Sequence, residues 1–244
     1  MEFLLDSNFG LPVHERPLHD VLATAGITTS ATNDLDALDR SVERHEPDVV
    51  YLPISDFHRL LARGDTHYRG FVIVTSKLTG RTNLPSVLVV RADDPARGIE
   101  ELRGSSLGYI NTSCSSSYFC PAILLSQRGE NLADFFDLRP TAPWQGQIDA
   151  VTSGTVRATM VLEDVWRTTP ANADLTKVIG RYDRAAGGVV VVRDGLDDDV
   201  AATLLDALLT WRPAPEALYG PFTPYRDQDL APFFRDMARL PAGF

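Results

Sequence analysis

The segment NTSCSSSYFC, residues 111 to 120, places six hydroxyl-bearing side chains between an apolar run typical of a strand and one typical of a helix. A helix start leaves about four backbone N–H groups without partners and carries a partial positive charge. Hydroxyls there add donors, and together the two sets can hold an oxyanion such as phosphate, phosphonate, sulfonate or carboxylate. The hydroxyls belong to Thr112, Ser113, Ser115, Ser116, Ser117 and Tyr118.

This serine loop (residues 111–118) would hold an anion with neutral dipoles alone, because no Lys or Arg lies between Gly104 and Gln127. Such a site selects a fully desolvated oxyanion and can release it reversibly. The alternative is that one Ser or Thr caps the helix and no ligand binds. Capping accounts for one hydroxyl, however, and six are crowded together here.

The composition argues against several classes of protein. The chain has 244 residues and a net charge of −10, which disfavours nucleic acid or an anionic membrane as the main partner. No run approaches the roughly 18–20 apolar residues of a membrane span, and the two cysteines make no disulfide framework. The N-terminal MEFLLDSNFGLPV lacks the features of a signal peptide. We therefore expect a cytoplasmic protein, or a periplasmic or extracellular one whose leader has been removed.

Strand-like and helix-like patterns alternate along the chain, which predicts an α/β fold with a mostly parallel sheet. Strands are expected at Glu2–Leu5, Asp48–Leu52 and Phe71–Val74, and helices at Pro17–Ala25 and Asp34–Arg44. After the serine loop, the pattern predicts a helix through Leu125, a strand IDAVT (Ile148–Thr152), another helix and a strand KVIGRY.

Two segments about one hundred residues apart echo each other: Pro85–Gly104 and Gly187–Leu208. Each is a strand followed by an acidic turn and an amphipathic helix. We interpret them as two crossing strands that join two Rossmann-like lobes, residues 1–90 plus 190–244 and residues 91–189. Two such lobes leave a cleft, which favours small-molecule binding. The alternative is a single doubly wound sheet.

The serine loop resembles the S-T-S-G-Y-x-x-P element of the phosphonate-binding proteins of ABC transporters, which have the type II periplasmic binding protein fold. Cys114, Ser115, Ser116, Ser117, Tyr118 and Pro121 match the element in register. Four more segments resemble the family in the right order: DVVYLPISDF, SVLVVRADDPARGIEELRG, QIDAVTSG and GPFTPYRDQDLAPFFRD.

The resemblance implies two lobes that close on the ligand, with the serine loop gripping its anionic head. Ser115 and Ser116 would be the side-chain donors, and the backbone N–H groups of Ser116–Tyr118 would complete the site, with Ser113 beside them. Cys114 stands where the family has its first serine, and a thiol is a weaker donor. Ser117 stands where the family has glycine, which leaves the close approach of the backbone to the ligand open.

Four more residues are expected to line the site. Tyr51 and Asp56 belong to the DVVYLPISDF segment that should border the cleft, and Asp56 would repel a second anion but pair with an ammonium group. Thr152 and Ser153 follow the predicted IDAVT strand and should face the cleft from the same lobe as the serine loop.

An enzyme on the same fold is the alternative function. Desulfinases, decarboxylases and dehydratases of small acids share this fold, and a cysteine at a helix N-terminus can have a lowered pKa. Cys114 or Asp56 would then be the reactive group and His58 the best candidate base, although His58 fits a surface helix position as well. Cys120 is expected to be a small buried residue.

No other pattern predicts a cofactor or a metal. Two cysteines in one loop give at most half a zinc site, and a Gly-rich nucleotide loop is absent. The adjacent acids Glu163 and Asp164 are expected on a solvated helix face, because neighbouring helical residues point apart.

The sequence therefore predicts a two-lobed protein that captures a small anionic ligand without changing it. Its expected partner is an ABC permease; a cytoplasmic sensor without a transporter is a further alternative.

Overall fold

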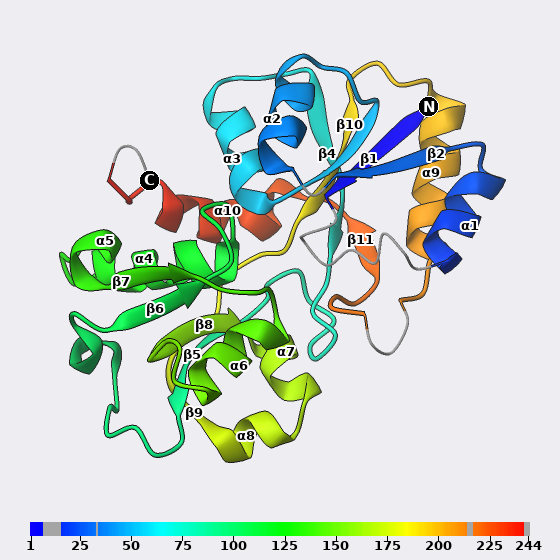
Figure 1. Cartoon of the computed structure of the whole chain (residues 1–244). Helices are drawn as coiled ribbons and strands as arrows, with labels where there is room; N and C mark the ends of the chain where they lie inside the picture. Colours follow the sequence, from blue (N-terminus) through cyan, green and yellow to red (C-terminus); the bar gives the residue numbers. More distant parts are fainter. Residues whose placement is uncertain (7–15, 33, 214–216, 242–244) are drawn as a thin grey trace. The chain divides into compact units, whose positions relative to one another are not determined.

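The protein, seen here in a computed structural model, is described for residues 1–6, 16–32, 34–213 and 217–241 (Figure 1). Its contacts divide the chain into two units. The first comprises Met1–Thr82 and Gly187–Asp229, and the second comprises Asn83–Ala186 and Leu230–Phe244. Each unit has its own β-sheet with helices packed on it.

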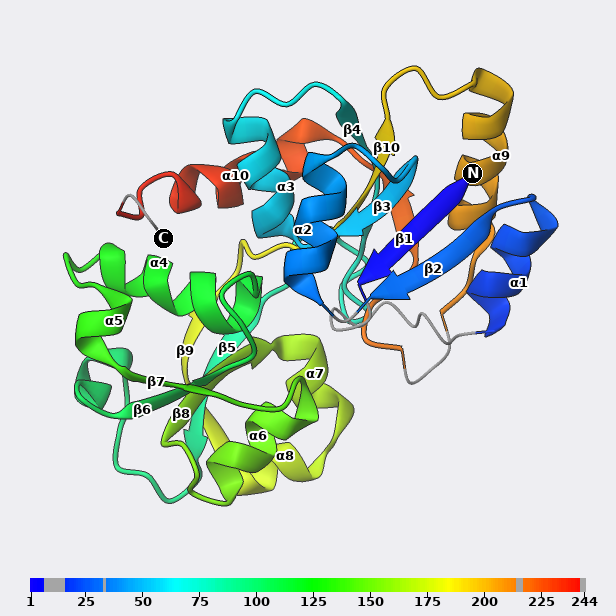
Figure 2. The same cartoon turned by 45° about the horizontal axis from the view of Figure 1, so that its top comes forward.

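The first unit contains a six-stranded sheet with the order β11-β4-β10-β3-β1-β2. Strand β1 lies between β2 and β3 and is parallel to both, whereas β10 runs antiparallel between β3 and β4. Helices α1 and α9 pack together, and α2 and α3 lie on the opposite face of the sheet (Figures 1 and 2). Its elements are β1 (Glu2–Asp6), α1 (Arg16–Thr24), β2 (Thr28–Thr32), α2 (Leu35–Glu43), β3 (Val49–Leu52), α3 (Ile54–Ala62), β4 (Tyr68–Val74), β10 (Val189–Arg193), α9 (Asp198–Thr210) and β11 (Phe222–Pro224).

Local sequence explains these elements well. In α2, Asp34 caps the helix by accepting a hydrogen bond from the Ala37 N–H at 2.9 Å, and Leu38 and Val42 bury one face. Strand β3 reads VVYL and is buried along its whole length, as expected for a strand inside a sheet covered by helices.

The second unit contains a five-stranded sheet with the order β7-β6-β8-β5-β9. Strands β6, β7 and β8 are parallel, and β5 runs antiparallel between β8 and β9. Its elements are β5 (Ser86–Arg91), the 3-10 turn η2 (Ile99–Leu102), β6 (Ser106–Tyr109), the π-helical turn η3 (Ser115–Phe119), α4 (Cys120–Ser126), α5 (Leu132–Phe135), β7 (Asp137–Pro140), α6 (Gln145–Thr152), β8 (Ala158–Leu162), α7 (Glu163–Thr168), α8 (Ala171–Leu175) and β9 (Thr176–Tyr182).

The predicted α/β class with two units is observed, but the boundaries differ from 1–90 plus 190–244 and 91–189. Residues 83–90 belong to the second unit, because β5 pairs with β8 and β9. Residues 187–189 belong to the first unit, whose β10 they enter. The two predicted crossings lie side by side, since Asn83 and Ala186 form an antiparallel bridge. A third crossing, inside α10 (Asp227–Met237), was not predicted.

Two local predictions were wrong. The residues after β5 form only the short turn η2 instead of an amphipathic helix, because Pro95 and Gly98 interrupt the segment. IDAVT forms the end of helix α6 rather than a strand: Ile148 and Val151 are buried at a spacing of three, and a short apolar run fits either structure.

Within the described residues, no helix combines the length and apolar character needed to cross a membrane.

Candidate functional site

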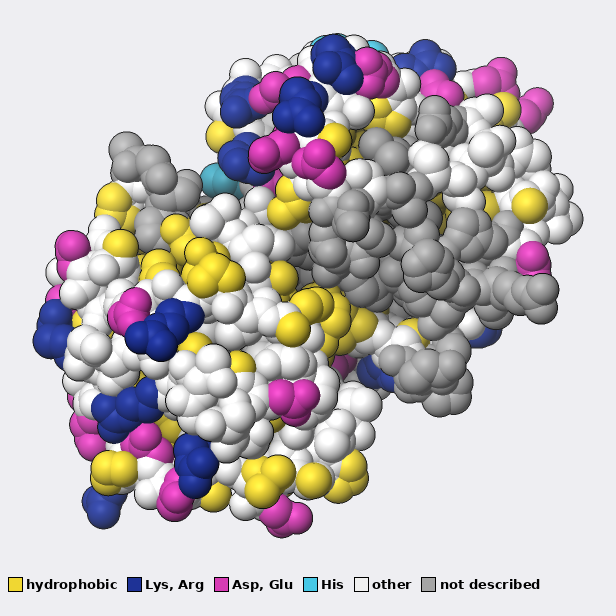
Figure 3. Space-filling view, viewed as in Figure 1, with side chains coloured by type: hydrophobic (Ala, Val, Ile, Leu, Met, Phe, Trp, Pro, Cys, Tyr) yellow, Lys and Arg dark blue, Asp and Glu magenta, His cyan; other side chains and the backbone are white. Residues whose placement is uncertain are grey.

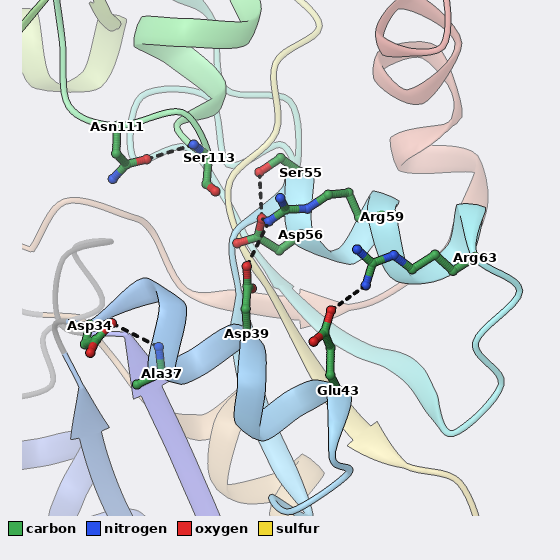
Figure 4. Close-up of polar contacts among 10 residues, drawn as sticks. All are labelled: Asp34, Ala37, Asp39, Glu43, Ser55, Asp56, Arg59, Arg63, Asn111 and Ser113. Atoms are coloured by element: carbon green, nitrogen blue, oxygen red, sulfur yellow. Dashed lines mark hydrogen bonds and ion pairs between the residues drawn. The ribbon is translucent and has the colours of Figure 1, made fainter. Parts of the chain in front are cut away.

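The serine loop lies at the carboxyl edge of the second sheet, between β6 and a continuous helix that η3 and α4 form from Ser115 to Ser126. Parallel α/β sheets usually bind ligands at this edge. The chain reverses just before the helix: Asn111 Oδ1 accepts a hydrogen bond from the Ser113 N–H at 3.0 Å, and Cys114 N–H donates to the Asn111 carbonyl at 3.3 Å (Figure 4). The predicted placement of the loop at a helix start is therefore observed.

The first turn of this helix is a π-turn, a form that occurs often at functional sites. The N–H groups of Tyr118 and Phe119 both donate to the Cys114 carbonyl at 3.2 Å, and the Cys120 N–H donates to the Ser115 carbonyl. The N–H groups of the three residues from 115 to 117 have no acceptor among the residues that the structure describes. The open donors therefore begin one residue earlier than predicted, and the Tyr118 N–H is already engaged.

Four of the six hydroxyls of the loop fall into two groups. Ser116 and Ser117 are buried: Ser116 Oγ lies 3.4 Å from Cys114 Sγ, and Ser117 Oγ accepts a hydrogen bond from the Ile110 N–H at 3.1 Å. Ser115 is half-buried and Thr112 exposed, and neither hydroxyl bonds to any described residue. Of these four, Ser115 and Thr112 therefore have the hydroxyls left with bonding capacity for a ligand.

Two tyrosines flank the loop. The rings of Tyr109, at the end of β6, and Tyr118 lie 5.7 Å apart between centroids. Burial, with a smaller contribution from Tyr109, raises the pKa of the Tyr118 hydroxyl, which therefore stays protonated at neutral pH and can donate a hydrogen bond.

The connection after β7 ends at the same edge and contains a strained residue that the sequence did not single out. Thr141 donates to the Tyr109 carbonyl with its N–H at 2.8 Å and its hydroxyl at 3.2 Å. Three residues later, Trp144 has φ 57° and ψ −113°, a conformation that is costly for a bulky side chain. Such strain often marks a functional position, but no clear signal in the sequence predicts it.

Glu163 and Asp164 follow β8 at the same edge, and the prediction of a solvated face was wrong. Their exposed fractions are 6% and 4%. Glu163 forms ion pairs with Arg167 at 2.7 Å and with Arg181 at 2.6 Å, and these pairs compensate the cost of burying its carboxylate. Neighbouring helical residues can both be buried here, because they form the first turn of a helix that leaves the buried end of β8 directly.

Thr152 and Ser153 do not lie beside the serine loop. They end α6 and precede β8, so they occupy the amino edge of the parallel strands, opposite the loop. Both hydroxyls donate to carbonyls of their own helix, Thr152 to Asp149 at 3.1 Å and Ser153 to Ala150 at 3.2 Å. Their expected position rested on IDAVT being a strand, and that prediction was wrong.

Tyr51 packs in the core of the first unit. It is fully buried, and its hydroxyl accepts a hydrogen bond from the Gly188 N–H at 3.1 Å. A Cβ at Gly188 would lie 2.2 Å from the ring, so the crossing segment depends on glycine here. Tyr51 thus contributes to the packing of the first unit, and its predicted ligand contact stays a prediction.

Asp56 lies in the first turn of α3 and is 5% exposed. Its carboxylate is ion-paired with Arg59, which also contacts Asp39 at 3.3 Å, and it accepts a hydrogen bond from the Ser55 hydroxyl at 3.4 Å (Figure 4). Its negative charge is therefore already compensated within the first unit.

The residues of the enzyme alternative belong to different units. His58 is half-buried on α3, and burial lowers its pKa. All five histidines of the chain precede Thr82, whereas Cys114 belongs to the second unit, where its sulfur contacts Ser116. Cys120 is fully buried as predicted, and burial raises the pKa of its thiol.

No cluster of three potential metal ligands occurs in the part of the chain that the structure describes.

A family model matches residues 21–219, most of the chain, and its description is that of an ABC transporter phosphonate periplasmic substrate-binding protein. The chain belongs to this family. The family implies a small ligand and a permease as partner. No curated protein matches the chain.

Solved structures show the same fold. The binding protein component of an ABC phosphonate transporter from Pseudomonas aeruginosa is 16% identical, with a TM-score of 0.72 over 100% of this chain and 89% of that chain. PhnD1 from Prochlorococcus marinus, solved in complex with methylphosphonate, is 13% identical, with a TM-score of 0.75 over 98% and 97%. The alkanesulfonate-binding protein SsuA from Xanthomonas axonopodis, bound to MOPS, is 13% identical, with a TM-score of 0.56 over 99% and 94%.

Proposed function

We propose that the protein binds a phosphonate or a related tetrahedral oxyanion at the serine loop and delivers it unchanged to an ABC permease. The observation that carries the proposal is the set of three consecutive N–H groups, residues 115 to 117, left without acceptors at the start of a helix. Charge-assisted hydrogen bonds from such groups to an anion are roughly twice as strong as neutral ones.

The hydroxyls of Ser115 and Thr112 supply further donors, and Tyr118 supplies a protonated phenol beside them. The nearest cations along the chain, Arg103 and Arg128, are ion-paired with Glu130 and Glu100. We therefore expect the dipoles of the loop, rather than these two cations, to balance the ligand charge. This suits a transport protein, because the ligand leaves without breaking a buried ion pair.

Trp144 is proposed to cover the bound ligand from the same edge of the sheet. Its unusual backbone conformation costs on the order of 1–3 kcal/mol, and a conformation of this kind persists where the surroundings or a ligand hold it in place.

The family match favours binding over the enzyme alternative. A Cys114 nucleophile would need a base within hydrogen-bond reach, and the group that its sulfur contacts is the hydroxyl of Ser116.

The test is isothermal titration of the protein with methylphosphonate, inorganic phosphate, methanesulfonate and acetate. We expect the tetrahedral oxyanions to bind and acetate to bind weakly or not at all. The double variant Thr112→Ala/Ser115→Ala should weaken methylphosphonate binding by about 100-fold, the loss of two hydrogen bonds to a charged group. Cys114→Ser should bind as well as the wild type or better, because a hydroxyl is a stronger donor than a thiol.

Thr152→Ala/Ser153→Ala is the matched control, since it removes two hydroxyls from the opposite edge of the same sheet. It should leave the affinity within about twofold. Equal losses in both double variants, or no binding of any oxyanion by the wild type, would refute the proposed function.

A further inference from the structure

Ser117 stands at the position of the glycine in the S-T-S-G-Y element that the loop resembles. A side chain at that position faces either the ligand or the protein interior. The structure shows the second arrangement: Ser117 is 0% exposed, and its Oγ accepts a hydrogen bond from the Ile110 N–H at 3.1 Å. Its own N–H is one of the three open donors.

The Ile110 N–H is the first backbone donor beyond β6. The ladder between β6 and β8 ends at the pair Gly108 and Thr159, and on the β7 side the last bond is from the Thr141 N–H to the Tyr109 carbonyl. A backbone N–H in a half-buried position needs a partner. Ser117 Oγ is the acceptor that it finds among the described residues.

This hydrogen bond closes the eight-residue segment from 110 to 117 into a ring. Within this hydrogen-bonded segment, the turn at Asn111 reverses the chain and the π-turn begins. The end of the strand and the beginning of the helix are thus fixed to each other independently of any ligand.

We propose that Ser117 is a positioning residue, whose hydroxyl holds the end of β6 against the π-turn so that the N–H groups of residues 115 to 117 converge on one anion. This inference rests on the proposed function of the loop. Ser117 acts on the ligand through its backbone and through the ring, and its side chain remains in the protein interior. Fixing the loop in advance strengthens binding because less conformational freedom is lost when the ligand arrives.

The test compares Ser117→Ala with wild type by titration with methylphosphonate well below the melting temperature. We expect affinity to fall about 3- to 10-fold, the effect of one neutral hydrogen bond. Ser117→Cys keeps a weak acceptor of similar size and should restore part of the affinity. Ser126→Ala is the matched control, because Ser126 Oγ also bonds to the backbone of this helix, at the Ile123 carbonyl, but away from the loop. It should leave affinity unchanged.

Amide hydrogen exchange distinguishes the loss of this one hydrogen bond from a general loss of stability. In the ligand-free proteins, the Ile110 amide should exchange faster in Ser117→Ala than in wild type, while the amides of α4 keep their rates. Wild-type affinity in Ser117→Ala, or an unchanged Ile110 exchange rate, would overturn the positioning role. Should Ser117→Ala fail to fold, Ser117→Cys carries the same comparison. A wild type that binds no oxyanion refutes the proposed function instead.

Discussion

The serine loop and the α2–α3 face of the first unit are both rich in polar groups, but they differ in how many of these groups have a hydrogen-bond or ion-pair partner. In the loop, three N–H groups and two hydroxyls have no partner among the described residues. On the α2–α3 face, where charged side chains crowd together (Figure 3), Arg63 pairs with Glu43 at 2.7 Å and Arg59 pairs with both Asp39 and Asp56. Charge density alone therefore does not distinguish the two regions as candidate ligand sites, whereas unsatisfied donors do.

The physical reason is the balance of desolvation and pairing. An exposed ion pair contributes about 0–1 kcal/mol and leaves little capacity for a further ligand. An N–H that leaves water without an acceptor costs about 1–3 kcal/mol, and a ligand that accepts from it recovers that cost. A neutral loop can thus bind an anion more selectively than a face rich in paired arginines.

The largest effect that tests this comparison outside the loop is expected for Asp56→Asn. Removing the carboxylate breaks a buried ion pair, so the free energy of unfolding should fall by about 2 kcal/mol, measured by urea denaturation. Because the charge is compensated by Arg59, methylphosphonate affinity should change less than about threefold. Asp39→Asn, which breaks the more exposed pair with Arg59, is the control and should cost less stability.

A binding defect in Asp56→Asn would contradict the distinction between the two regions. In particular, a selective loss of affinity for aminomethylphosphonate would show that the Asp56 carboxylate pairs with the ligand and not with Arg59.

A smaller effect on the free energy of unfolding is expected from His67. Its Nε2 is buried near this face and lacks a partner among the described residues. The His67 ring stacks on His45 at 3.9 Å, with Asp65, Arg193 and Asp194 around it. Burial, and then the positive charge of protonated His45, lowers the pKa of His67. Its neutral form therefore stabilises the fold above about pH 6.5, the value in the unfolded chain, and this contribution is lost as the pH falls below that value.

Urea denaturation at pH 7.5, 6.5 and 5.5 measures this loss. Replacing His67 by Gln should flatten the decrease in unfolding free energy between pH 6.5 and 5.5. An unchanged slope would show that another group causes it.

Local sequence was enough to predict the alternation of strands and helices and the placement of the serine loop at a helix start. It was not enough where the position of a strand depends on pairing with strands far away in the sequence. Strand β5 belongs to the second unit because β8 and β9, more than sixty residues later, flank it. The same limit applies to IDAVT, whose residues fit a helix face or a strand equally well until β8 occupies the sheet.

The chemistry of the site was predictable to the level of residue type but not of orientation. The serines and their helix start are visible in the sequence, but that Ser117 turns inward to Ile110 depends on the end of the β6 ladder. Burial of Glu163 and Asp164 likewise depends on how β8 ends, and the strain at Trp144 leaves no clear sequence signal.

The most direct test of the central claim, that backbone N–H groups of the loop hold the anion, is to delete one of them. Proline has no N–H and is tolerated in the first turn of a helix, and the residue before Ser115 has the extended conformation, ψ 117°, that proline requires. Titration with methylphosphonate should therefore show Ser115→Pro binding at least about 10-fold more weakly than Ser115→Ala, which loses only the hydroxyl. Equal affinities of these two folded variants would contradict the account.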